Sequence, residues 1–335
     1  MKTLRYIGVR VVMLGPVLLG ISLLTFAVAH LVPGDPARML AGDQADRATL
    51  EAIRTSFRLD DPLWVQYLVY LQRLLQGDMG TSYREQVPVL EALLRTFPAT
   101  LELAIVAVIL ALAAALPLGI LGAVYHNRVV DHVIRVLSVG GVSIPVFWLG
   151  IMLLLLFYYR LGWLPGTGRL DPHLSIPPQV TGMYLLDSLL AGQWATFRDA
   201  LLHILLPAFS LAYGYLALVA RMLRSSMLDV LGQDYIRTAR AMGLPFDRIV
   251  VGHALKNAMI PTVTVAGLGI ATLLGGAVLT ETVYSWPGMG KLMVDSILFL
   301  DYPVVTGATM LIAATYVTIN LFVDVLYTAL NPQIE

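Results

Sequence analysis

Residues 99–123 read ATLELAIVAVILALAAALPLGILGA and contain one charged side chain, Glu102. A helix of about 20 apolar residues crosses the roughly 30 Å of hydrocarbon in a bilayer, so this stretch predicts a membrane-spanning helix. The whole chain has the same character, since 58% of its 335 residues are hydrophobic and 13% are charged. Its mean hydropathy is +0.76. These values exclude an ordinary water-soluble globule and predict an all-α membrane protein.

Five further apolar stretches have a similar length, which predicts a polytopic fold with six transmembrane helices. We place the six spans at Ile7–Leu31, Ala99–Ala123, Ile134–Tyr159, His203–Met222, Ala258–Thr280 and Val304–Leu330. The first could instead be a signal peptide, because Ala27-Val28-Ala29 is similar to a cleavage site. Its apolar run is longer than a signal peptide needs, which favours a span.

Basic residues in short loops predict which face of the membrane each loop occupies, because Lys and Arg accumulate on the cytoplasmic side. The formal net charge is zero, so only this local distribution is informative. Basic residues gather in the N-terminal arm, in the link between the second and third spans, and in the link between the fourth and fifth spans. These residues are Lys2, Arg5 and Arg10; Arg128 and Arg135; and Arg221, Arg224, Arg237, Arg240, Arg248 and Lys256. The three segments are therefore expected on the cytoplasmic side. With an even number of spans, both termini are expected in the cytoplasm.

The loops on the opposite face are longer and are expected outside the cell. The first, about residues 32–98, has helical spacing at Leu50, Ile53, Arg54 and Phe57 and again at Trp64, Tyr67, Leu68 and Leu71, which predicts a helical cap. The second, about residues 160–202, is rich in Gly and Pro before an apolar stretch at Met183 to Leu190, which predicts a folded hairpin or a short amphipathic helix. With no linker to a separate soluble part, residues 1–335 are expected to form one transmembrane domain.

The cytoplasmic link between the fourth and fifth spans, about residues 223–257, is longer than a simple connection requires. Tyr235, Ala239 and Met242 share one face of a predicted helix and Arg237 and Arg240 share another. Gly243 is placed to end that helix, and Pro245 suits the first turn of the next. In that second helix the repeating apolar positions are Phe246, Ile249, Val250 and His253. The pattern predicts helix, glycine turn, helix.

The stretch DYIRTARAMGLPFDRIVVGHALKNAMIP, residues 234–261, resembles the coupling segment of binding-protein-dependent ABC importer permeases. Arg237, Thr238 and Ala239 fall on the Glu-Ala-Ala positions of the family consensus, and Gly243 falls on its glycine. Only Ala239, Gly243 and Leu255 match the general consensus, but the departures are typical of the dipeptide, oligopeptide and nickel group. LLTFAVAHLVPGDPARML, GDMGTS, FPATLELA and TETVYSWPGMGKLMVDSI extend the resemblance along the chain, closest to the B-type subunit of dipeptide permeases.

The resemblance implies a bacterial inner-membrane subunit that forms half of a translocation path for dipeptides or small peptides. It implies a second permease chain, two ATPases that carry ATP and Mg, and an external substrate-binding protein. The residues implied to couple to the ATPases are Tyr235, Arg237, Thr238, Ala239, Arg240, Gly243 and Leu244. Oligopeptides, glutathione and a nickel complex are alternative substrates of the same machinery.

The sequence itself carries no phosphate loop, so the chain is expected to be no enzyme and to hold no cofactor. The nearest string, SWPGMGKL, has Ser285 in place of the first glycine and Leu292 in place of Ser or Thr. A gradient-driven secondary transporter would leave the patterned cytoplasmic link unexplained. A membrane hydrolase would need a catalytic cluster, and the sequence has no HExxH or GxSxG motif.

Three further sets of residues lie in or beside the predicted spans. Glu281, Trp286, Pro287 and Gly288 are predicted to form an outer turn or gate that meets the binding protein, with Trp286 at the membrane interface. Glycines and prolines within the spans, such as Gly140, Gly141 and Pro145, either allow close packing or line the translocation path. Ionisable residues near span ends, Glu102, Glu281 and Asp324, are expected to snorkel to the interface or to make a local hydrogen bond rather than to form a proton relay. No metal site is expected.

Overall fold

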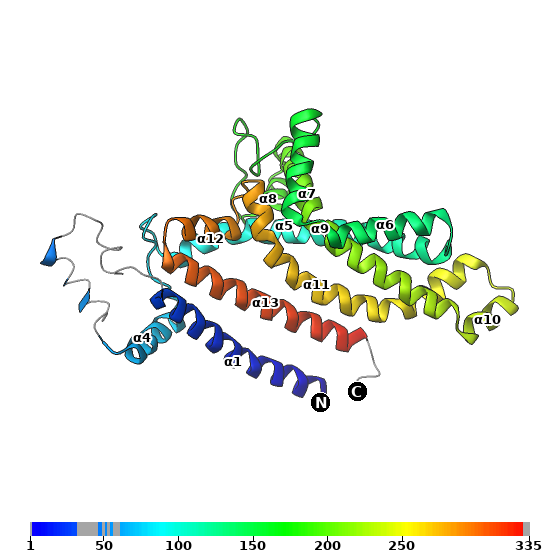
Figure 1. The fold of residues 1–335 in the computed structure, drawn as a ribbon, viewed down its shortest axis with the longest axis horizontal. Helices are drawn as coiled ribbons and strands as arrows, with labels where there is room; N and C mark the ends of the chain where they lie inside the picture. Colours follow the sequence, from blue (N-terminus) through cyan, green and yellow to red (C-terminus); the bar gives the residue numbers. More distant parts are fainter. Residues whose placement is uncertain (1, 32–45, 49–50, 52–53, 56–60, 331–335) are drawn as a thin grey trace. The chain divides into compact units, whose positions relative to one another are not determined.

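A computed structural model of the chain describes residues 2–31, 46–48, 51, 54–55 and 61–330. Within these ranges the protein is built from helices, and its one β-bridge joins Thr81 to Pro88. The helices, labelled in Figure 1, are α1 (Lys2–Leu31), α4 (Leu63–Leu75), α5 (Val89–Val124), α6 (Val129–Ser143), α7 (Val146–Leu153), η1 (Leu154–Arg160), α8 (Tyr184–Leu190), α9 (Trp194–Leu231), α10 (Asp234–Ala241), η2 (Arg248–Ala254), α11 (Leu255–Val283), α12 (Met289–Leu298) and α13 (Tyr302–Leu330). The all-α prediction is confirmed.

Four of these helices have segments long and apolar enough to cross a membrane, at Val89–Val124, Trp194–Leu231, Arg248–Ile270 and Tyr302–Val323. The pair Val129–Ser143 and Val146–Arg160 passes the same criteria together but bends by 108° at its break. The predicted third span is therefore not one straight helix. Pro145 lies in the break, and the preceding Ile144 is extended because a proline disfavours helical conformation in the residue before it. In α1 the apolar part, Val12–Ala27, is shorter than the other candidate spans. The described residues therefore contain four candidate spans, or five if the bent pair counts as one span.

Contacts divide the chain into two compact units, with α1, α5, α12 and α13 each contributing residues to both. The first unit contains residues 98–291 with both chain ends, and the second contains residues 8–97 and 292–317. In the first, α5 presents Ala99, Leu103, Ala107, Ala111 and Ala115 every fourth residue, all fully buried. Small residues on one face let helices approach closely. This face packs with buried residues of α9 and α11 to form the main core.

Glycines in the first unit complete the close packing. A Cβ atom on Gly141 of α6 would lie 2.5 Å from the Ala217 Cβ of α9, and one on Gly269 of α11 would lie 2.4 Å from the Tyr215 ring. Both distances are too short for side chains, so these positions require glycine. Of the two interpretations of the glycine-rich spans, close packing is thus the one that Gly141 and Gly269 support.

In the second unit, α4 packs on α1. The Tyr67 hydroxyl lies 2.9 Å from Ser22 Oγ, and its ring meets Phe26 at a centroid distance of 5.3 Å. The turn before α5 is fixed by buried Asp301, which accepts hydrogen bonds from Ser82 Oγ at 2.5 Å and from the Tyr83 amide at 3.1 Å. The predicted helix around Trp64 to Leu71 is confirmed as α4. Most of the preceding part of the expected cap, including Leu50, Ile53 and Phe57, lies outside the described residues.

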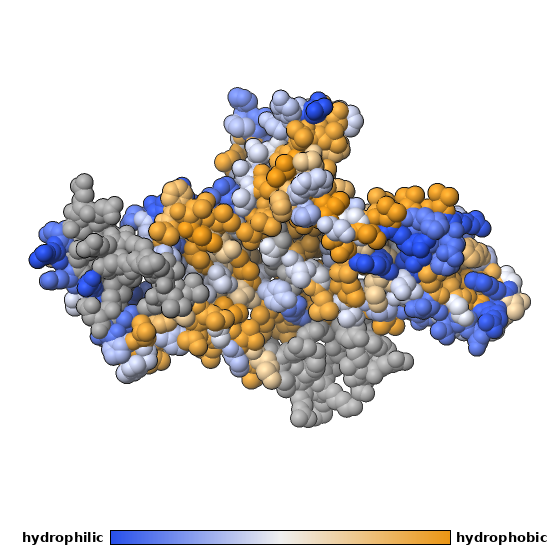
Figure 2. Space-filling model, in the orientation of Figure 1, coloured by the Kyte–Doolittle hydropathy of each residue, from blue (hydrophilic) through white to orange (hydrophobic). Residues whose placement is uncertain are grey.

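The predicted boundaries are less accurate than the helices themselves. The fourth span, expected at His203–Met222, belongs to a helix of 38 residues, so the first part of the expected cytoplasmic link continues α9. The short helix expected after Met183 is confirmed as α8. Figure 2 shows that hydrophobic residues cover much of the helix surface of the first unit, while hydrophilic residues gather at α10 and at the nearby end of α6.

Candidate functional site

The first candidate site is α10 with its glycine turn. Gly243 has a φ of +76°, and its amide donates to the Arg240 carbonyl while the Leu244 amide donates to the Ala239 carbonyl. These two bonds form a Schellman motif, in which a residue in left-handed conformation ends the helix. The prediction that this helix ends at Gly243 is confirmed. Asp234 in the first turn and Arg240 in the last also complement the helix dipole.

One face of α10 is fixed to its own chain. Ile236 and Ala239 are 0% and 4% exposed, and they pack with Leu223 and Met227 of α9 and with Ile249 of η2. The sequence predicts that Ala239 contacts an ATPase, and its burial contradicts that contact. The buried face is centred between Ile236 and Ala239, because residues three apart share one side of a helix.

The opposite face of α10 is open. Tyr235, Arg237, Thr238, Arg240 and Gly243 are exposed, while Leu244 is half-buried against the core of α9 and α10. Met242 and Phe246 add exposed apolar surface at 70% and 50%. We define the coupling patch by five residues: Tyr235, Arg237, Arg240, Met242 and Phe246. Aromatic residues, Met and Arg are the types enriched in protein interfaces.

The second predicted helix is present, but its apolar face differs from the prediction. Helical structure begins at Phe246 and runs through the π-helix η2 directly into α11. Ile249 and Val250 are buried as expected, whereas Phe246 and His253 are exposed. A π-helical turn bonds residues five apart, so it shifts the phase on which the i, i+3, i+4, i+7 rule depends. Phe246 therefore does not share the buried face of Ile249 and Val250 and is available to a partner.

An ion pair between the ends of two helices supports the same region. Arg224 of α9 binds the fully buried Asp131 of α6 through Nε at 2.6 Å and through a second nitrogen at 2.9 Å. The Asn127 amide donates to the same carboxylate at 3.0 Å. The geometry is bidentate, which fixes orientation as well as adding energy. The sequence pattern identifies Arg224 only as one basic residue of a cytoplasmic loop.

The second candidate site is the predicted outer turn, which lies between α11 and α12. The Glu281 carboxylate is fully buried and accepts hydrogen bonds from Thr100 Oγ1 at 2.6 Å and from the Lys291 amide at 3.0 Å. Thr100 Oγ1 in turn accepts from the Met289 amide at 2.8 Å. A Cβ on Gly288 would lie 2.3 Å from a Glu281 carboxylate oxygen, so only glycine fits there.

Trp286, which the sequence predicts at the membrane interface, is enclosed by its own chain. It is 1% exposed, and its indole N–H donates to the Ala99 carbonyl at 2.9 Å. A buried indole requires such an acceptor, and Ala99 within α5 supplies it. The turn at Trp286, Pro287 and Gly288 is present, but Glu281 and Trp286 hold it against α5 instead of facing outward. Of the two alternatives for Glu102 and Glu281, hydrogen bonding is the one observed, with partners far away in sequence.

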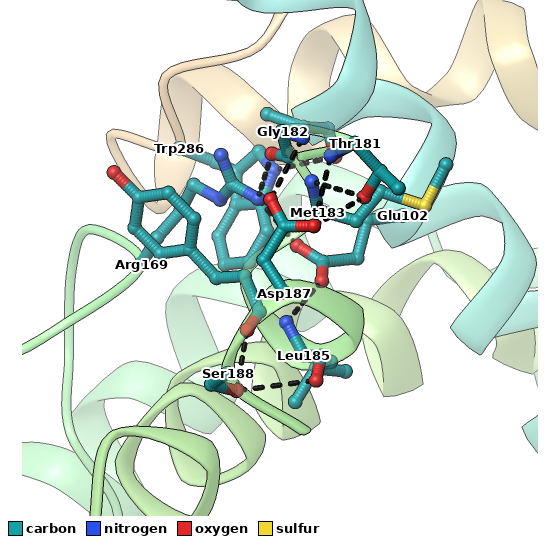
Figure 3. A network of polar contacts seen from close by, with 11 residues as sticks. Glu102, Arg169, Thr181, Gly182, Met183, Leu185, Asp187, Ser188 and Trp286 are labelled. Atoms are coloured by element: carbon teal, nitrogen blue, oxygen red, sulfur yellow. Dashed lines mark hydrogen bonds and ion pairs between the residues drawn. The ribbon is translucent and has the colours of Figure 1, made fainter. Parts of the chain in front are cut away.

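A third cluster joins the second predicted external loop to α5, as Figure 3 shows. Arg169 donates to Glu102 Oε2 at 2.6 Å and to the Gly182 carbonyl at 3.0 Å. Glu102 Oε1 accepts the Leu185 amide at 2.7 Å. The Arg169 guanidinium lies 3.7 Å from the centre of the Tyr184 ring. The Gly- and Pro-rich sequence around Arg169 carries no signal of this pairing, because the two charged residues are 67 positions apart.

Asp187 closes the same loop. Its carboxylate is buried, and it accepts hydrogen bonds from the Thr181 amide, the Thr181 hydroxyl and the Gly182 amide at 2.8–2.9 Å. Burial raises the pKa of Asp187, but the hydrogen bonds from Thr181 and Gly182 together outweigh burial and lower the pKa from its ordinary value. No cluster of three or more metal-ligating side chains occurs in the described part of the chain.

Comparison with known proteins places this architecture in a family. The model of the binding-protein-dependent transport system inner membrane component matches residues 115–335, and the model of its N-terminal part matches residues 3–104. A probable D,D-dipeptide transport system permease protein of Escherichia coli (strain K12) is 53% identical over 95% of this chain and 94% of its own length.

Two other relatives match over nearly their full lengths. A dipeptide transport system permease protein of Escherichia coli (strain K12) is 43% identical over 99% of both chains. A di/tripeptide transport system permease protein of Pseudomonas aeruginosa (strain UCBPP-PA14) is 44% identical over 99% of both chains. Together with the helices that qualify as membrane spans, these matches show that the chain belongs to the family of inner-membrane permease components of binding-protein-dependent transport systems.

Proposed function

We propose that this permease forms one half of the translocation path of an ABC importer for dipeptides. In this proposal a second, similar permease chain forms the other half, and two separate ATPases bind ATP and Mg. An external binding protein delivers the substrate. The six-span topology with both termini in the cytoplasm belongs to the same proposal and rests on the distribution of Lys and Arg.

The observation that carries the proposal is the two-sided nature of α10. The coupling patch is exposed, while Ile236 and Ala239 on the other face are packed against α9 and η2. Because η2 continues into α11, a displacement of the patch is passed directly to two candidate spans. A surface loop without this buried face would absorb the motion. Conversion of ATP-driven movement into rearrangement of spans requires such a rigid link.

The coupling patch also has the charge and shape expected of a docking surface. Arg237 is paired with the exposed Asp234 at 3.1 Å, so its guanidinium remains near solvent. The apolar side chains of Met242 and Phe246 would be buried against the ATPase, and Arg237 and Arg240 would meet its polar or acidic rim. We propose this patch, rather than Ala239, as the contact.

Dipeptides are favoured as substrates by the relatives, whose names specify D,D-dipeptides, dipeptides and di/tripeptides. A glutathione transport system permease of Salmonella choleraesuis (strain SC-B67) is also similar, at 41% identity, so the family match alone does not select the substrate. The higher identity to the D,D-dipeptide relative supports D,D-dipeptides as a specific second candidate.

The decisive experiment is reconstitution of this chain with its partner permease, ATPases and binding protein in lipid vesicles. We expect ATP-dependent uptake of a dipeptide, with L,L-dipeptides, D,D-dipeptides, a tetrapeptide, glutathione and a nickel complex compared at equal concentrations. Uptake of only the last three would contradict the proposed substrate. Uptake by the permease chain alone, without ATP, would contradict the whole assignment and would instead support a gradient-driven transporter.

A further inference from the structure

Three segments distant in sequence converge on one turn of α5. Trp286 donates to the Ala99 carbonyl, Glu281 accepts from Thr100, and Arg169 donates to Glu102. We call this cluster the outer knot and define it by six residues: Ala99, Thr100, Glu102, Arg169, Glu281 and Trp286. All six are less than 9% exposed.

Within the outer knot, Arg169 and Glu102 connect parts that would otherwise be separate. Glu102 holds α8 through the Leu185 amide, and Arg169 holds the preceding loop segment through the Gly182 carbonyl. The Arg169 guanidinium lies 5.5 Å from the centre of the Trp286 ring, and the Gly168 amide donates to the Tyr284 carbonyl at 3.0 Å. The loop at residues 164–192 is thus tied both to α5 and to the turn after α11.

The buried ion pair of Arg169 and Glu102 is better suited to fix the orientation of the segments that it joins than to stabilise the fold. Arg169 and Glu102 side chains are only 7% and 5% exposed, and the Arg169 Nε is buried without a hydrogen-bond partner in the described part of the chain. A buried ion pair seldom stabilises a fold more than apolar residues of equal volume would. It does fix the relative orientation of the groups it joins, because its hydrogen bonds are directional and its charges cannot separate at low cost.

We propose that Arg169 and Glu102 are positioning residues for transport, which hold the loop at residues 164–192, the turn at Trp286 and the turn of α5 at residues 99–102 as one body. This body keeps its internal geometry while the spans rearrange. The translocation path therefore opens at the edges of the body and not within it. The expected effect of the pair on transport rests on the proposed ATP-driven function. The rigidity itself is a property of this chain and is tested separately.

The test uses pulsed electron paramagnetic resonance on the full complex. The chain contains no cysteine, so spin labels attached at Val180→Cys in the loop and Thr282→Cys before the turn are unique within it. Both positions are exposed and lie outside the outer knot. With partner cysteines replaced, we expect one narrow distance distribution that is the same without nucleotide and in the ATP-trapped state.

The pair is then removed in the double variant Glu102→Gln with Arg169→Met, which leaves no unpaired buried charge and so preserves folding better than either single change. We expect a distance distribution broadened several-fold. Basal ATP hydrolysis stays unchanged and substrate transported per ATP falls several-fold. A merely structural role would lower both activities together. The matched control is Glu85→Gln, which breaks the exposed Arg95–Glu85 ion pair of 2.7 Å and should change nothing.

Two results would overturn the proposal. One is a distance between Val180 and Thr282 that differs between the nucleotide states of the wild-type complex, because the loop would then move relative to the turn. The other is a double variant that keeps both the narrow distribution and the wild-type transport per ATP. If ATP-dependent uptake is absent in the wild type, the proposed function fails, yet the distance measurement still decides whether the body is rigid.

Discussion

At the scale of single residues, backbone conformation decides how the coupling region is built. Gly243 adopts a left-handed conformation, and a Cβ added there would meet nothing within 4 Å. The need for glycine is therefore conformational and not a matter of space. Gly288 is the opposite case, because its neighbour Glu281 occupies the volume that a side chain would need.

Replacement of Gly243 by Val should weaken coupling by loosening the turn. The left-handed conformation costs a residue with a Cβ about 1–2 kcal/mol, and β-branched residues suffer most. We expect normal membrane insertion with reduced dipeptide-stimulated ATP hydrolysis, measured on the reconstituted complex. Gly243→Asn is the matched control, since Asn tolerates this conformation. Equal loss of activity in both variants would show that the turn conformation is not what matters.

Asp187 predicts a pH-dependent loosening of the loop at residues 164–192. Its pKa is lowered in the folded state, so its contribution to stability is present above the ordinary value of 3.8 and is lost as the pH falls below it. The mobility of a spin label at Val180 should therefore rise in acid, below about pH 4. In Asp187→Asn the acid-induced change should disappear, and a variant that keeps it would assign the transition to another carboxylate.

At the scale of helices, close approach is the organising feature. The alanine face of α5 and the glycines of α6 and α11 allow backbones to pack at distances that larger side chains would prevent. In a bilayer, where lipid is as apolar as the helices, such packing supplies much of the association energy. The pair Asp131 and Arg224 then fixes α6 to α9 by charge.

Gly141→Ala should disrupt the contact between α6 and α9. Its new Cβ would lie 2.5 Å from the Ala217 Cβ and 3.0 Å from the Tyr213 carbonyl oxygen, which belongs to the rigid backbone. Overpacking of this kind costs about 1–3 kcal/mol. A lower midpoint of thermal unfolding in nanodiscs is expected. Gly275→Ala, where nothing lies within 4 Å, is the control and should leave the midpoint unchanged or raise it.

At the scale of the whole molecule, the proposed function requires a force to pass from the coupling patch to the spans. The patch lies on α10, and the buried face of α10 adjoins α9 and η2. The outer knot lies on α5, whose buried face joins α9 and α11 in the main core. Both sites are therefore connected to the same helices, which is the connectivity that a transport cycle requires.

Reversal of charge at Arg237 and Arg240, both to Glu, should uncouple the complex. The side chain of Arg237 is 79% exposed, so the change leaves the fold intact while opposing an acidic ATPase rim. We expect the ATPases to co-purify less well and dipeptide uptake to fall at least about tenfold, as loss of one interface hot spot commonly produces. Arg95→Glu, at an arginine 61% exposed and also paired with a carboxylate, is the control. Normal uptake in the double variant would exclude the coupling patch.

The sequence by itself determined the membrane class, most of the long helices and the glycine turn, because these depend on local quantities. Twenty apolar residues need a bilayer whatever surrounds them, and the Schellman turn requires only Gly243 and the preceding helix. The family resemblance is also local, because short contiguous motifs carry it.

Only the tertiary structure decided which side chains face a partner. Ala239 and Trp286 were expected at surfaces and are buried, while Phe246, which the apolar repeat groups with Ile249 and Val250, is exposed. The reasons are a π-helical phase shift, a buried face set by α9, and a hydrogen bond to the Ala99 carbonyl. The pairing of Arg169 with Glu102 has no signal in the sequence either, since contacts between residues far apart along the chain arise only when the helices pack.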